Sequence, residues 1–199
     1  MGILHGTIVE ETTGEKLDAK VHVLNAMGNF SHPHNSLLKR GPGTQFFFSD
    51  GEFETRGSRG RTDILVERGT EYEPYRTTVE LPEKGCVDIE IPLRRWHHPQ
   101  ERHWYPGNTH IHYDENEKQP DRRLGVDCSV EGYNVTCVSV LDRRQLPYAS
   151  NKYPIGVMNE FKTAHHVLDI GEENRHYGDN SPWGFGYGHV MFLNIRNLV

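Results

Sequence analysis

Short runs of alternating apolar and polar residues fill the first half of the sequence. Alternate side chains of an extended chain point to the same side, so such runs predict strands with one buried face. Turn-forming residues separate the runs. The expected strands cover 3–10, 19–24, 45–48, 52–56, 62–67, 75–81 and 87–93. Six or seven short strands at this spacing, without helical periodicity, predict an all-β, immunoglobulin-like sandwich over residues 1–96.

One stretch between these runs, residues 25–44, is rich in Gly, Pro, Asn, Ser and His. This composition predicts a long loop. His32 and His34 could bind a metal there, but a solvated loop is their expected setting. We expect the first half to serve as a structural or substrate-presenting module.

The pattern changes after residues 97–103, a polar segment interrupted by Pro99, which we expect to be a linker. From 104 to 199, apolar runs alternate with segments that carry helix-start signals. Strands are expected at 109–112, 135–141, 166–170 and 188–195, and helices over 120–131 and after Pro154. This alternation predicts βαβ units around a parallel sheet or barrel, so an α/β unit is expected after the sandwich.

Two histidines in the first of these later strands are spaced for metal binding. His110 and His112 face the same side of an extended chain, with β-carbons roughly 6.5–7 Å apart, so both imidazoles can reach one ion. The alternative is a pair of solvated histidines on an edge strand. Further candidate ligands are Asp142, Glu172 and Glu173, at the ends of the second and third strands, and His189, at the start of the fourth. Parallel α/β folds gather their chemistry at strand ends, and imidazole with carboxylate suits Zn²⁺, Mn²⁺ or Fe.

Composition narrows the classes of partner. The formal net charge is −6 without a long run of one sign, so the basic surface that nucleic-acid binding needs is not expected. No stretch approaches the ~20 apolar residues of a membrane-spanning helix. Histidine is abundant, with 13 in the chain and nine of them after Trp96. Cys86, Cys128 and Cys137 show neither zinc-finger nor disulfide-framework spacing, and the last two are expected in the core.

Three short motifs carry a family resemblance over roughly residues 104–199. They are Gly107-Asn108-Thr109-His110-Ile111-His112, Gly171-Glu172-Glu173 and Gly188-His189. Together they resemble the polymerase-and-histidinol-phosphatase (PHP) superfamily, in particular its CehA/McbA-type metallohydrolases. That branch often carries a β-sandwich before the PHP domain, in agreement with the pattern of the first half.

The resemblance implies a distorted β/α barrel that holds metal ions, two of them expected here, at its carboxyl face. It implies hydrolysis of a small-molecule phosphoester or other ester by metal-activated water. His110, His112 and His189 match metal ligands of the family. Glu173 matches the carboxylate that bridges two ions, and a one-residue slip would select Glu172 instead. Such an arrangement suggests export, although no signal peptide is visible at the start of the sequence.

Two departures from the family pattern bear on activity. The family has Asp-His where this chain has Asp142-Arg143, and an arginine cannot ligate a metal. Asp142 would act in catalysis or pair with a neighbouring arginine, and Arg143 would contact an anionic substrate or be a structural residue. The barrel also needs further strands and a late Asp-x-His pair after Val199, so we expect the front portion of a longer enzyme. The alternative is a non-catalytic two-domain binding or adhesion protein, or an inactive fragment with structural histidines.

Overall fold

The computed structural model describes residues 1–39, 43–141, 148–176 and 188–198. Internal contacts divide the chain into two compact units. The first consists of residues 1–103 with 130–132, and the second consists of residues 104–129 with 133–199. Within the described residues, no helix is long and apolar enough to cross a membrane.

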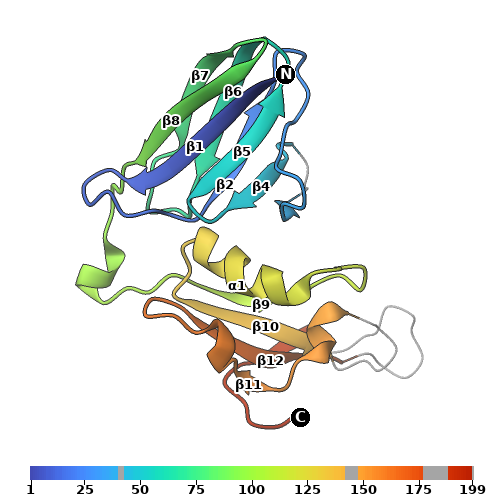
Figure 1. Cartoon of the computed structure of the whole chain (residues 1–199). Coiled ribbons are helices and arrows are strands. Elements are labelled where there is room, and N and C mark those ends of the chain that lie inside the picture. The colour runs from blue at the N-terminus through green and yellow to red at the C-terminus, as the bar shows by residue number, and fades with distance from the viewer. Residues whose placement is uncertain (40–42, 142–147, 177–187, 199) are drawn as a thin grey trace. The chain divides into compact units, whose positions relative to one another are not determined.

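The first unit is a sandwich of two sheets (Figure 1). A three-stranded sheet has β1 at its centre, with β5 antiparallel on one side and β8 parallel on the other. An antiparallel five-stranded sheet has the order β3-β4-β2-β6-β7. The bounds are β1 Gly2–Glu10, β2 Ala19–Leu24, β3 Leu38–Lys39, β4 Phe46–Ser49, β5 Glu52–Gly57, β6 Gly60–Glu67, β7 Tyr75–Leu81 and β8 Gly85–Leu93. The predicted β-sandwich is confirmed.

Alternation builds the core of this sandwich. On β1, Leu4 and Ile8 are fully buried, whereas His5, between them, faces outward. Side chains from both sheets meet in one apolar cluster: Leu4, Ile8, Ala19, Val21, Val23, Phe47, Phe53, Ile64, Val66, Leu81, Ile91 and Leu93. Burial of this apolar surface is the main favourable contribution to the folding of the first unit.

The second unit is built on a mixed five-stranded sheet in the order β11-β12-β10-β9, with β13 also on β12. β9, β10 and β12 are parallel, whereas β11 and β13 are antiparallel to β12. The bounds are β9 Gly107–Ile111, α1 Pro120–Val130, β10 Val135–Leu141, β11 Gly156–Val157, β12 Val167–His176 and β13 Gly188–Phe192. Short 3-10 helices cover Ala149–Lys152 and Asn159–Phe161, and another, Pro99–Arg102, lies near the end of the first unit. Figure 1 shows α1 beside this sheet.

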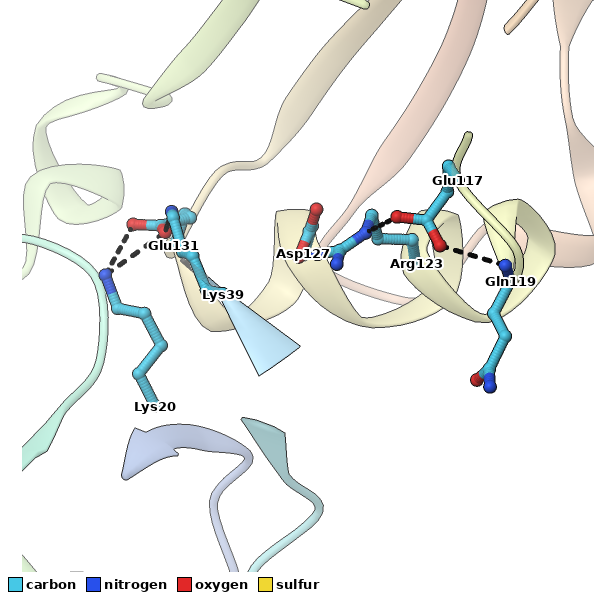
Figure 2. A network of polar contacts seen from close by, with 7 residues as sticks. All are labelled: Lys20, Lys39, Glu117, Gln119, Arg123, Asp127 and Glu131. Carbon is cyan, nitrogen blue, oxygen red and sulfur yellow. Dashed lines mark hydrogen bonds and ion pairs between the residues drawn. The ribbon is translucent and has the colours of Figure 1, made fainter. Parts of the chain in front are cut away.

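Polar contacts define the start of α1. Pro120 occupies the first helical turn, where its missing N–H costs nothing. The Glu117 carboxylate accepts the backbone N–H of Gln119 at 2.9 Å and also contacts the Arg123 guanidinium (Figure 2). A second carboxylate, that of Asp127, lies 3.4 Å from Arg123 one turn further along. Although burial opposes ionisation, these hydrogen bonds hold the pKa of Glu117 below its ordinary value.

The predicted helix after Pro154 is wrong. Ile155, Met158 and Phe161 have helical spacing, but Gly156 between them adopts φ +106° and pairs with β12 in the short strand β11. The backbone N–H of Met158 bonds to the Leu168 carbonyl at 3.0 Å, which fixes this segment against β12. The apolar residues therefore pack from the short strand β11, its flanking residues and the 3-10 helix Asn159–Phe161 that follows.

The predicted β/α barrel is also wrong. In the described part of the second unit, α1 is the one α-helix, and the sheet is partly curled rather than closed. The physical reason lies at the edge of β12. β11 and β13 occupy that edge and run antiparallel to β12, where a barrel would continue with a parallel strand.

Candidate metal centre

The site forms at the carboxyl end of β9, where an irregularity changes the register with β10. Asn108 lies opposite Thr136, and Ile111 lies opposite Val138. The chain therefore advances three residues along β9 for two residues along β10, as in a β-bulge. Such bulges redirect side chains, and this one immediately precedes His112. Gly107 lets β9 begin close to β10, because a β-carbon there would lie 2.9 Å from the Val135 carbonyl oxygen.

Glu173 reaches the site from β12. In the parallel register it lies opposite Leu141, the last residue of β10, and its side chain is 0 % exposed. Successive residues of a strand point to opposite faces, so Glu172, although also buried, is directed away from the position of Glu173. The register thus selects Glu173 as the carboxylate that meets the histidines.

His189 reaches the same carboxylate from β13. β13 pairs with β12 so that Glu173 lies opposite Met191 and Arg175 opposite His189. The His189 Nδ1 atom lies 2.5 Å from Glu173 Oε1. Gly171 permits this pairing, because a β-carbon there would lie 2.3 Å from the Phe192 carbonyl oxygen.

Three ligand atoms meet on the other side of the carboxylate. The Nε2 atoms of His110 and His112 are 3.1 Å apart, and His110 Nε2 is 3.3 Å from Glu173 Oε2. His112 Nε2 contacts the same carboxylate oxygen. The two imidazole rings are nearly perpendicular, at 88°, and the Nε2 atom of each contacts the carboxylate.

A backbone carbonyl decides which nitrogen of His112 can bind a metal. His112 Nδ1 lies 2.8 Å from the Ser139 carbonyl oxygen, which can only accept a hydrogen bond. Nδ1 therefore carries a proton, and in the neutral form of the ring Nε2 would present its lone pair to Glu173 Oε2. Two acceptors in contact need a proton or a cation between them. This is the hydrogen-bonding pattern that orients histidine ligands in metal sites.

The remaining predicted residues, and two groups that the sequence did not predict, lie at various distances from this site or outside the described residues. Asp142 and Arg143 lie outside the described residues, so their placement beside this site stays a prediction. His166 lies at the opposite end of β12, where its Nε2 is 3.2 Å from Thr136 Oγ1. Sequence reasoning missed Tyr148, whose ring centroid is 5.7 Å from that of His112. It also missed the Ser139 carbonyl, because a backbone oxygen leaves no signal in residue type.

No protein-family model matches the chain, and no curated protein matches it. Solved structures with some similarity include the minor pilin GBS52 of Streptococcus agalactiae, with 16 % identity, TM-score 0.37 and coverage of 49 % of this chain and 46 % of that one. The pilus 2b backbone protein of group B streptococcus shows 16 % identity, TM-score 0.36, and 47 % and 41 % coverage. A DUF3823 family protein from Bacteroides uniformis shows 14 % identity, TM-score 0.29, and 48 % and 43 % coverage. The chain spans less than half the length of each.

The expected membership of the PHP superfamily and the expected ester hydrolysis are wrong. No PHP model matches the chain. The mixed sheet of the second unit agrees with this correction, because its described part forms no barrel. A small-molecule ester substrate accordingly has no support.

Proposed function

We propose that the chain is a non-catalytic binding protein whose second unit holds a divalent transition-metal ion. Its ligands are His110 Nε2, His112 Nε2 and Glu173 Oε2. The observation that carries the proposal is the convergence of these atoms on one point, with the His112 lone pair directed there by the Ser139 carbonyl.

Two of the three separations are close to those around a small tetrahedral ion, and the third, between His112 Nε2 and Glu173 Oε2, is shorter and would have to widen when an ion binds. Nitrogen and oxygen ligands about 2.0–2.2 Å from zinc lie roughly 3.3–3.6 Å from one another. The observed 3.1 Å between the two Nε2 atoms and 3.3 Å from His110 Nε2 to the carboxylate need only small shifts to match. Two imidazoles and a carboxylate favour Zn²⁺, with Mn²⁺ and Fe²⁺ binding more weakly.

The second oxygen of Glu173 offers a position for a second ion. Oε1 lies beside His189 Nδ1, while Oε2 faces His110 and His112, so the carboxylate is placed to bridge. Without a second ion, His189 serves as a hydrogen-bond partner of the same carboxylate. The number of ions bound distinguishes these two arrangements.

The decisive experiment is a zinc and manganese titration of the metal-free full chain by calorimetry, with metal content after dialysis as a second readout. His110→Ala combined with His112→Ala is expected to abolish binding at this site. His165→Ala is the matched control, because that exposed histidine lies at the other end of the sheet. Circular dichroism of each variant checks the fold.

Two results would count against the proposal. One is zinc binding that the double variant leaves unchanged, or no binding at all in the metal-free chain. The other is hydrolysis of a chromogenic phosphodiester by the metal-loaded chain, which we expect to leave this substrate intact. Turnover that disappears in the double variant would contradict a purely binding role.

A further inference from the structure

A second set of metal-binding side chains lies in the first unit, on the outward face of the three-stranded sheet. His5 occupies the middle of β1, opposite Glu54 of β5 and Asp88 of β8. Cys86 precedes Asp88 by two residues on β8, so both side chains point to the same face. Three strands therefore bring imidazole, thiol and carboxylate groups together, although 81 residues separate His5 from Cys86.

The three closest groups have the separations of ligands around one ion. His5 Nδ1 lies 3.1 Å from Cys86 Sγ and 3.1 Å from Asp88 Oδ1. Cys86 Sγ and Asp88 Oδ1 are 3.9 Å apart. With bonds of about 2.0–2.3 Å, tetrahedral zinc ligands lie roughly 3.3–3.7 Å from one another. An ion at the centre of this triangle would require shifts of a few tenths of an ångström.

Glu54 orients the histidine of this cluster. Its Oε2 atom lies 3.2 Å from His5 Nε2, so with an ion on the Nδ1 side the ring would donate Nε2–H to this carboxylate and direct its Nδ1 lone pair toward the ion. Arg56 lies 3.3 Å from the other oxygen of Glu54 and keeps that carboxylate in place. The arrangement matches the carboxylate–histidine–metal relay found around protein-bound zinc.

We infer that His5, Cys86 and Asp88 form a zinc-type site in the first unit, with solvent completing the coordination. The inference is independent of the centre proposed for the second unit. A thiolate ligand selects zinc-like ions over magnesium and calcium, which prefer oxygen ligands. The side chains are exposed, so an ion can enter from solvent and exchange.

Cobalt is the probe that tells the two sites apart. Co²⁺ bound to a thiolate gives an intense near-ultraviolet sulfur-to-metal charge-transfer band, whereas His110, His112 and Glu173 contain no sulfur. The full chain, reduced and metal-free, is titrated with Co²⁺ in the absence of oxygen. The band is expected to appear, to disappear when Zn²⁺ displaces cobalt, and to persist when both His110 and His112 are replaced by alanine.

Variants then assign the band to particular residues. Cys86→Ser is expected to abolish it, and His5→Gln to do the same while retaining the thiol. Glu54→Gln is expected to weaken cobalt affinity by about 10–100-fold, the usual effect of losing an orienting partner. Glu90→Gln is the matched control, because Glu90 is exposed on the same face of β8, two residues beyond Asp88. Circular dichroism confirms that each variant folds.

The outcomes divide cleanly. A band that is lost in the Cys86 and His5 variants but kept in the Glu90 variant supports the site. Absence of the band in the unaltered chain, or its survival in Cys86→Ser, overturns the inference. Cys128 and Cys137 are buried in the second unit, so a band that survives Cys86→Ser would reveal metal access to one of them instead.

Discussion

The Nδ1 atom of His112 lies 2.8 Å from the carbonyl oxygen of Ser139, on the neighbouring strand β10. This contact sets the tautomer of the ring and restricts its rotation. This ring orientation is the one that binding of the proposed metal ion requires. His110 is more exposed, at 48 % of its side chain against 16 % for His112, and loses more side-chain freedom when it binds.

This difference predicts unequal effects of removing the two histidines. His112→Ala is expected to weaken zinc binding by about tenfold or more beyond the loss caused by His110→Ala, since orienting contacts are worth that much in metal sites. Competition with a chromogenic chelator measures both affinities under the same conditions. Equal losses would show that the Ser139 carbonyl does not prepare the site.

Gly171 connects the packing of β13 to the same site. A β-carbon at this position would lie 2.3 Å from the backbone oxygen of Phe192, and a backbone atom can yield only if the strand moves. Gly171→Ala is expected to destabilise the second unit by about 1–3 kcal/mol and to displace His189 from Glu173. Urea unfolding and zinc titration measure the two effects.

The matched control for this change is Gly125→Ala. Gly125 lies inside α1, and the nearest atom to an added β-carbon is Phe161 Cδ1 at 3.8 Å, an ordinary contact. Alanine is a better helix former than glycine, so this variant is expected to gain up to about 1 kcal/mol. If both alanine variants lose stability equally, the Phe192 contact is not the cause.

Much of the first unit could be predicted from sequence, because each strand there has one buried face. Alternation placed a strand over residues 3–10 that the structure shows as Gly2–Glu10, and one over 19–24 that matches β2. The pairing of the strands could not be predicted, because the two neighbours of β1 begin far along the chain, at Glu52 and Gly85. The His5–Cys86–Asp88 cluster depends on that pairing and went unnoticed in the sequence for this reason.

The second unit was harder to predict, because a continuous apolar run does not show whether the strand runs parallel or antiparallel to its neighbours. Val135–Leu141 was correctly expected to be a buried strand, yet nothing in residues 188–195 shows that β13 runs antiparallel to β12. The spacing of His110 and His112 predicted a shared face. The choice between Glu172 and Glu173 required the register of β12 against β10.

His166 predicts a loss of stability in mild acid. Burial lowers the pKa of its imidazole below the ordinary value of 6.5. The unfolded chain therefore takes up a proton on His166 more readily than the folded chain. The contribution of the neutral His166 to folding stability is fully present above pH 6.5 and is lost as the pH falls below that value. Denaturant unfolding of His166→Gln is expected to show a weaker decline over this range. His165→Gln, an exposed neighbour, should leave the decline as it is; a decline that His166→Gln does not reduce would be the contrary result.

Gly6 and Phe53 form a close cross-strand pair in the sandwich. They lie opposite each other on β1 and β5, and a β-carbon on Gly6 would meet two atoms of the Phe53 ring at 2.3 and 2.4 Å. Gly6→Ala is therefore expected to lower the free energy of unfolding by about 1–3 kcal/mol, since overpacking forces the ring out of the core.

Phe53→Leu leaves a cavity and is also destabilising. Combined, the two changes should cost clearly less than their sum, because the smaller side chain makes room for the new methyl group. Denaturant unfolding of all four proteins in this cycle measures the coupling, and simple additivity would mean that the ring does not confine Gly6.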